Sequence, residues 1–196
     1  MSGTYPTDPE FSAVGIESKH ANLVSETRSG RRQVRSIGSQ RWAFTAQYSP
    51  MTRADFAPVH AFVISQQGQL GTFSITPPVI SNAQGNVSGS VLTSAAHSIG
   101  DSSIAVDAMT GTLKAGDFIK FAGHSKVYMV TADATADAGS ADLSIEPPLV
   151  AALSDNEAVT YDGVAFTMRL NNDVQSYSLD GFERYNYEVD MVEVIT

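Results

Sequence analysis

Large apolar side chains alternate with small or polar ones over residues 41–48, which is typical of a strand buried on one face. Ser49-Pro50 ends this strand, because proline lacks the N–H group that a strand ladder needs. Apolar residues then recur at helical spacing over 55–66, and alternation resumes over 72–76. This central stretch is therefore predicted to form a strand, a short helix and a second strand. The side chains expected to fill its core are Trp42, Phe44, Phe56, Phe62 and Phe73.

The start of the helix depends on Pro58. If Thr52 were the N-cap, Pro58 would fall in the second turn and cost about 3 kcal/mol. If Asp55 were the N-cap, Pro58 would lie in the first turn, where its missing N–H group is harmless. We therefore predict a helix near 55–66 with Asp55 as its cap.

A double proline, Pro77-Pro78, closes the central stretch, and the pattern changes after it. Residues 79–100 are small and nearly uncharged, and we expect an exposed strand edge within 85–94. Short apolar runs separated by glycines follow, at the regular spacing of a small barrel or sandwich. Residues 132–141 resemble a mobile loop between two of these runs. The predicted short strands are 103–107, 118–121, 126–131, 142–146 and 157–161.

A short internal echo indicates how the domains are arranged. The sequence SITPPV at 74–79 recurs as SIEPPL at 144–149, and each copy ends a strand with a rigid exit. Large alternating side chains return only afterwards, over 163–170 and 185–195. We therefore predict a mainly β fold, a β-sandwich or split barrel with one short helix, interrupted by a small inserted β-barrel or β-sandwich. The predicted boundaries are an N-terminal arm at 1–22, a split β domain at 23–80 plus 162–196, and a linker with the inserted domain at 81–161. The N-terminal arm is expected to be weakly ordered or to become ordered on a partner.

Composition limits the classes of protein to which this chain could belong. The chain has 196 residues, 42% of them hydrophobic, which is enough for one core or slightly more. It has no cysteine, so disulfides and thiolate metal sites are excluded. No apolar run reaches the roughly 20 residues that span a bilayer, and the first residues do not resemble a signal peptide. We expect no membrane insertion, and assembly in a cytoplasm.

Charge is distributed unevenly along the chain. Residues 1–53 carry seven basic and four acidic residues, or +3, and the rest carries five basic and seventeen acidic residues, or −12, which together give −9. Four arginines, Arg28, Arg31, Arg32 and Arg35, lie in and beside the turn of a predicted hairpin over 22–37. They are interpreted either as assembly contacts with an acidic partner or as a solvated hairpin tip. Specific nucleic-acid binding is not expected, because phosphate contacts need clustered basic residues over a wider surface.

No sequence motif indicates catalysis. The chain lacks a nucleophile elbow, HExxH, a P-loop and GxGxxG after a strand. Three aspartates at 133, 137 and 142 do not have EF-hand spacing, so neither a metal nor another cofactor is expected. Four acidic residues, Glu183, Glu188, Asp190 and Glu193, could line a cleft, but a solvated strand face explains them more simply. We predict that the protein is not an enzyme.

The stretch RWAFTAQYSPMTRADFAPVHAFVISQQGQLGTFSITPP resembles tail proteins of long-tailed bacteriophages, and the segment from GTLKAGDFIKF to NEAVTY is similar to a β module of the same proteins. The closing YNYEVDMVEVI is similar to their last strand. The resemblance covers about three quarters of the chain. It identifies the chain as a distal-tail or minor tail protein of the virion tail.

The resemblance implies a ring, commonly sixfold, that joins the tail tube to the tail tip or baseplate. The split β domain would form the ring, and the inserted domain would project outward. The implied partners are other copies of the chain, the tail tube protein and the tip, hub or baseplate proteins. Two alternatives remain open: a carbohydrate- or host-surface-binding module of a tail tip, and a phage-associated hydrolase.

Overall fold

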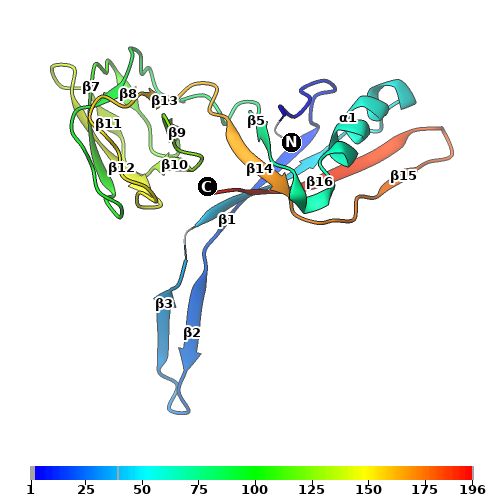
Figure 1. Ribbon diagram of the computed structural model, residues 1–196, viewed down its shortest axis with the longest axis horizontal. Coiled ribbons are helices and arrows are strands. Elements are labelled where there is room, and N and C mark those ends of the chain that lie inside the picture. Colours follow the sequence, from blue (N-terminus) through cyan, green and yellow to red (C-terminus); the bar gives the residue numbers. More distant parts are fainter. Residues whose placement is uncertain (1–2, 39, 196) are drawn as a thin grey trace. The chain divides into compact units, whose positions relative to one another are not determined.

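The computed structural model describes residues 3–38 and 40–195, and these residues form a mainly β protein with one α-helix (Figure 1). The predicted fold class is thereby confirmed. Contacts divide the chain into two compact units. The first comprises Pro6–Thr72 and Arg169–Glu193, and the second comprises Phe73–Met168 with the short described segments 3–5 and 194–195.

One antiparallel sheet is built on the two longest alternating patterns in the sequence. Phe44 lies opposite Met191 and Ala46 opposite Val189 in the central strand pair, so their apolar side chains share one face. These four residues are almost completely buried. The strand order is β1 (Ala13–Lys19), β4 (Arg41–Gln47), β16 (Tyr185–Glu193), β14 (Phe166–Leu170) and β5 (Phe73–Ile75), and β15 (Tyr177–Leu179) also pairs with β16.

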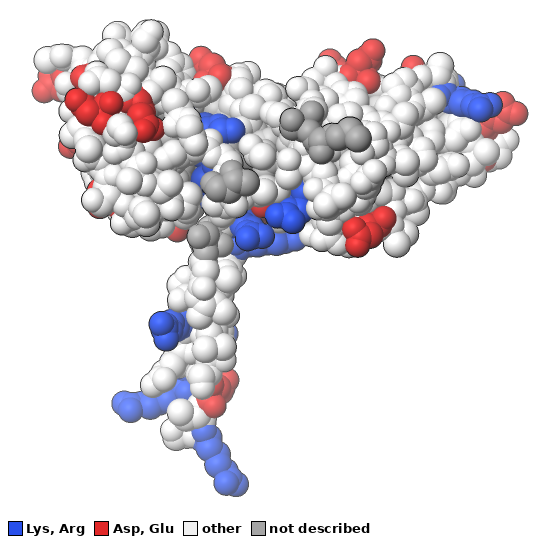
Figure 2. Space-filling view, viewed as in Figure 1, with Lys and Arg blue, Asp and Glu red and all other residues white. Residues whose placement is uncertain are grey.

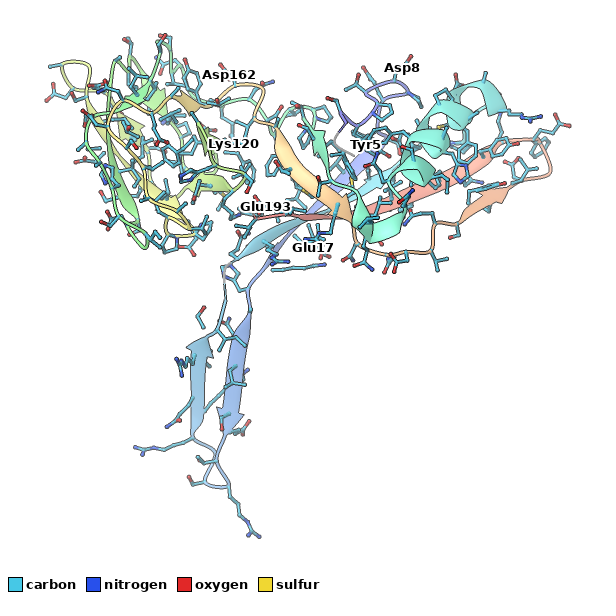
Figure 3. The ribbon with its side chains drawn as sticks, viewed as in Figure 1. Tyr5, Asp8, Glu17, Lys120, Asp162 and Glu193 are labelled. Carbon is cyan, nitrogen blue, oxygen red and sulfur yellow. The ribbon has the colours of Figure 1, made fainter. Side chains whose placement is uncertain are left out.

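The N-terminal segment corrects one expectation. The sequence predicts a weakly ordered arm at 1–22, whereas β1 pairs with β4 over its whole length, from Ala13 opposite Gln47 to Lys19 opposite Arg41. Further upstream, the Tyr5 N–H group donates to the Ser74 carbonyl at 2.8 Å, and the Tyr5 ring packs beside Phe73 (Figure 3). The first two residues of the predicted arm lie outside the described residues.

The helix α1 (Arg53–Ser65) is capped by Thr52, so the prediction of Asp55 as its cap is wrong. Thr52 Oγ1 accepts from the Asp55 N–H group at 3.4 Å and donates to Asp55 Oδ2 at 2.6 Å. Pro58 therefore lies inside the helix, and it leaves one carbonyl of the first turn without its usual donor. The cap and the burial of Phe56, Val59 and Val63 offset that loss. A short 3₁₀ turn, η1 (Gly68–Leu70), follows the helix.

The second unit contains a barrel-like sheet whose first and last strands meet. The Thr93 N–H group donates to the Glu157 carbonyl, and Val159 N–H to the Val91 carbonyl, both at 2.9 Å. The exposed edge expected within 85–94 is therefore wrong, because these contacts close the barrel. The strand order is β13 (Val159–Thr160), β9 (Phe118–Phe121), β10 (Val127–Val130), β12 (Ala141–Glu146), β7 (Ser103–Asp107) and β6 (Leu92–Thr93).

A small second ladder orders the segment predicted to be a mobile loop. Within 132–141, β11 (Ala134–Thr135) pairs with β8 (Thr112–Leu113), and Ala136 N–H donates to the Gly111 carbonyl at 2.9 Å. The mobile loop is therefore also a wrong prediction. Residues 132–141 show no apolar alternation typical of a strand, because Ala134 is the one buried residue among them.

Two aspartates hold the chain where it enters and leaves the barrel. Asp117, which is 1% exposed, accepts from the N–H groups of Gln84 and Lys114, both at 2.8 Å. Asp162 accepts from Ala83 N–H at 3.0 Å (Figure 3). The unit thus extends about from residue 83 to residue 162 as one bonded module. The predicted boundaries at 81 and 161 stay predictions, since β5 and β14 pair with each other just outside them.

Candidate assembly surface

A two-stranded arm carries the four predicted contact arginines. It consists of β2 (Asn22–Glu26), β3 (Arg32–Ser36) and the turn between them. Every described residue from 15 to 38 is exposed, so the arm has solvent on both faces (Figure 2). An isolated two-stranded ribbon is marginally stable in water, so this arm is suited to being covered by a partner.

The turn of the arm is well defined. Thr27 N–H donates to the Arg31 carbonyl, and Gly30 N–H donates to the Thr27 carbonyl, both at 2.9 Å. Gly30 has φ +79°, a conformation that glycine adopts without strain. These bonds give the arm a fixed tip from which Arg28 and Arg31 extend.

The two faces of the arm differ in charge. Residues alternate across a ribbon, so Arg31 and Arg35 share one face, and Arg32 lies on the other, directly opposite Glu26. Arg35 lies opposite Leu23, which is 58% exposed. None of the four arginines forms an ion pair with a residue that the structure describes. The face of Arg31 and Arg35 is thus basic and partly apolar.

Aromatic rings fill the space between α1 and the sheet. The Phe56 ring centroid lies 4.5 Å from that of Tyr185 and 5.4 Å from that of Tyr187. Tyr177 of β15 also contacts Phe56, at 4.9 Å. Sequence reasoning missed these tyrosines as packing partners of the helix, although their alternation within residues 185–195 was visible. Of the predicted core residues, Trp42, Phe44, Phe56 and Phe73 are buried and Phe62 is half-buried.

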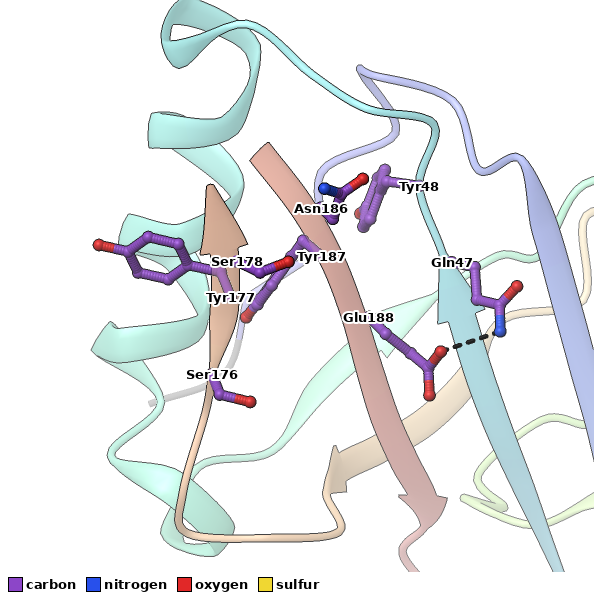
Figure 4. Close-up of a pocket in the computed structure, with 8 residues that line it drawn as sticks. All are labelled: Gln47, Tyr48, Ser176, Tyr177, Ser178, Asn186, Tyr187 and Glu188. Atoms are coloured by element: carbon purple, nitrogen blue, oxygen red, sulfur yellow. Dashed lines mark hydrogen bonds between the residues drawn. The ribbon is translucent and has the colours of Figure 1, made fainter. Parts of the chain in front are cut away.

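A polar groove of about 490 Å³ lies where β15 and β16 meet the end of β4 (Figure 4). Gln47 Nε2 donates across the strands to Glu188 Oε2 at 2.9 Å. Sequence reasoning placed Glu188 on a solvated strand face and gave no sign of the groove. We call this site the β15–β16 groove, and its lining residues are Gln47, Tyr48, Ser176, Tyr177, Ser178, Asn186, Tyr187 and Glu188.

Tyr187 is the unusual member of the groove. Its side chain is 4% exposed, and its hydroxyl has no hydrogen-bond partner among the described residues. Burial raises the pKa of Tyr187 above its ordinary value, and the neighbouring Tyr48 adds a smaller contribution in the same direction. A buried hydroxyl without a partner is costly. The Tyr187 ring packs beneath α1 against Phe56, on the opposite face of β16 from Glu188.

The acidic residues considered for catalysis lie in different environments. Glu193 is completely buried and accepts from the Trp42 N–H group, whereas Asp190 accepts from Thr45 Oγ1 at 2.7 Å on the opposite face of β16. Glu183 lies in the exposed turn before β16. The structure therefore brings Glu188 and Asp190 to one face and separates them from the other two.

Neither a metal-binding cluster nor a membrane-spanning helix is found among the described residues. The described residues contain no group of three or more histidines or acidic residues that could hold a metal ion. Asp133 instead binds Lys114 Nζ at 2.6 Å, and this bond, together with one from Ala115 N–H, lowers the pKa of Asp133. No helix among the described residues is long and apolar enough to cross a membrane.

Comparison with known proteins agrees with the inserted module. Residues 80–164 match the family model described as the distal tail protein pb9, B domain. No curated protein matches the chain at a significant level. The matched segment covers nearly the same residues as the barrel that Asp117 and Asp162 hold together. The match supports a structural role in the virion tail. Residues 80–164 therefore form a distal tail protein B domain, and this domain supports a distal tail family of tailed bacteriophages for the chain.

Proposed function

We propose that this protein forms a ring, with sixfold symmetry, at the distal end of a long phage tail, and that the ring joins the tail tube to the tip or baseplate. The observation that carries the proposal is the match of residues 80–164 to a domain of a distal tail protein. Its partners are further copies of itself, the tube protein and the tip, hub or baseplate proteins.

The first unit supports self-assembly. A ring requires two unlike surfaces on each copy that fit one another head to tail. The arm offers a basic surface with exposed apolar residues, and the strand face that carries Glu188 and Asp190 offers an acidic one. Because the arm buries none of its own residues, a neighbouring copy supplies the cover that it lacks.

The proposal is tested by mass and symmetry. The purified chain, examined by native mass spectrometry and electron microscopy at low and high salt, is expected to form closed rings of about six copies. Changing Arg31, Arg32 and Arg35 together to glutamine should weaken the rings, and added salt should weaken the wild-type rings in the same way. A chain that stays monomeric both alone and in purified tails would contradict the proposal.

The alternative, a module that binds host saccharide, predicts a different result. The full-length chain would give a specific signal on a glycan array, and that signal would survive dissociation of the ring. We infer a non-enzymatic role instead, because the acidic residues of β16 are divided between its two faces and engaged by Trp42 and Thr45.

A further inference from the structure

We propose that the β15–β16 groove of one copy receives the Arg31 and Arg35 face of the β2–β3 arm of the next copy. The inference rests on the proposed ring and assigns the two surfaces that meet within it. Its ligand is a guanidinium group of a second copy of this chain.

The groove has the chemistry that a guanidinium group needs. Glu188 Oε2 accepts from Gln47, while no described residue donates to Glu188 Oε1. The hydroxyl groups of Ser176 and Ser178 and the amide of Asn186 provide further acceptors along the groove (Figure 4). An arginine carries five N–H donors in a planar fork and binds a carboxylate through two of them.

The groove presents its carboxylate on the solvent side of the sheet. Neighbouring residues of a strand project to opposite faces, so Glu188 lies on the exposed face of β16, whereas Tyr187 lies on the face covered by α1. The carboxylate of Glu188 is therefore the group that an incoming arginine meets.

The arm has a matching face. Arg32 faces Glu26 across the ribbon, which partly compensates its charge, whereas Arg31 and Arg35 have no acidic residue opposite them. Leu23 lies beside Arg35 and adds exposed apolar area to this face. The face therefore presents two uncompensated guanidinium groups next to a hydrophobic contact.

The arm of a copy lies away from the groove of the same copy. The arm continues from β1 after Lys19, where β1 lies opposite Arg41, and the groove lies at the other end of β4, at Gln47. Six residues of strand separate these ends by about 20 Å. The arm extends away from the β1–β4 pair and does not fold back over it (Figure 1). Arm and groove at opposite ends of one strand pair give a head-to-tail contact, the type of interface from which rings are built.

Cross-linking tests the contact directly, because the natural chain has no cysteine. Gln33→Cys, on the arm face between Arg31 and Arg35, and Ser178→Cys, in the groove, are made in separate chains, mixed at low salt and treated with a short bismaleimide. The inference predicts a dimeric product at least about tenfold more abundant than in the control mixture of Gln33→Cys with Ser98→Cys. Ser98 is an exposed serine of the second unit, so it matches the residue lost at Ser178 and leaves Arg35 and Glu188 in place. Equal yields in the two mixtures would overturn the inference.

Charge reversal tests the energetics in chains without cysteine. Arg31→Glu with Arg35→Glu, and separately Glu188→Arg, should each weaken self-association at least about tenfold. The chain carrying all three changes should regain association, since the charges are exchanged. The same arm changes combined with Asp155→Arg, at an exposed aspartate of the second unit, should not regain it.

The two proposals fail in distinguishable ways. If the wild type forms rings, and the reversed chains form them equally well, the ring stands and the arm-to-groove contact is overturned. If the cross-link forms selectively but neither the chain nor purified tails contain a closed ring, the contact stands and the proposed ring is overturned.

Discussion

The buried carboxylate of Glu193 accepts a hydrogen bond of 3.1 Å from the backbone N–H group of Trp42, across the central strand pair. It joins the last residue of β16 to the second residue of β4. We expect Glu193→Ala to lower the free energy of unfolding by about 1–3 kcal/mol, because the N–H group would stay buried without this partner.

Glu193→Gln is the matched control for that change. Its amide oxygen still accepts from Trp42, so it should cost less than Glu193→Ala in urea unfolding. If both variants were as stable as the wild type, the bond would not stabilise the sheet.

Phe56 should be the most important ring under the helix. Its contacts with Tyr185 and Tyr187 would be lost in Phe56→Ala, and we expect about 3–5 kcal/mol of destabilisation. Phe62→Ala serves as the control, since Phe62 lies on the same helix but is half-buried. Denaturant unfolding should give less than half the loss for Phe62→Ala, and equal losses would contradict the assigned core.

Gly85 lies where the chain crosses the small ladder of the second unit. A Cβ at this position would overlap the Thr112 carbonyl oxygen, so the backbone must shift in Gly85→Ala. We expect a loss of about 1–3 kcal/mol of stability, measured by thermal unfolding. Gly15→Ala is the control because its Cβ would lie 3.7 Å from the nearest atom, in Thr45, and it should change stability by less than about 0.5 kcal/mol. A harmless Gly85→Ala would contradict the close packing of this segment.

The central strands of the fold were predictable from the sequence. The alternation at 41–48 and 185–195 gives β4 and β16 because each strand buries one face, and side chains repeat with a period of two. The hairpin at 22–37 was predictable for a similar reason, because Gly30 allows its turn.

Elements that depend on distant partners were not predictable. β1 contains only two large apolar residues, Val14 and Ile16, and its pairing with β4 is what makes it a strand. The Thr52 cap places Pro58 inside the helix, and the burial of Val59 and Val63, which offsets this cost, depends on the sheet beneath the helix and not on local sequence. The barrel closure at Thr93 depends on residues more than sixty positions away.

Of the two candidate surfaces, the arm was predictable from the sequence and the groove was not. The arginines stand beside a turn that the sequence indicates, so their exposure was expected. The β15–β16 groove exists only after β15 pairs with β16, which brings Ser178 opposite Asn186, near Gln47 of a third strand. No local motif carries that information.

Tyr187 should make stability depend on alkaline pH. The folded-state pKa of Tyr187 is raised above its ordinary value of 10.0, mainly by burial and to a smaller extent by Tyr48, so the unfolded chain releases this proton first. The contribution of Tyr187 is therefore fully present below pH 10 and is lost as the pH rises further, toward the folded-state pKa.

Tyr187→Phe isolates this effect because it keeps the ring and removes the group that titrates. We expect the variant to lose less stability than the wild type between pH 9 and pH 11, in urea unfolding at each pH. At pH 7 it should be as stable as the wild type or slightly more so, since the deleted hydroxyl has no partner among the described residues. Parallel pH profiles for the two proteins would contradict the burial of the Tyr187 hydroxyl, because they would show that it is solvated in the folded state.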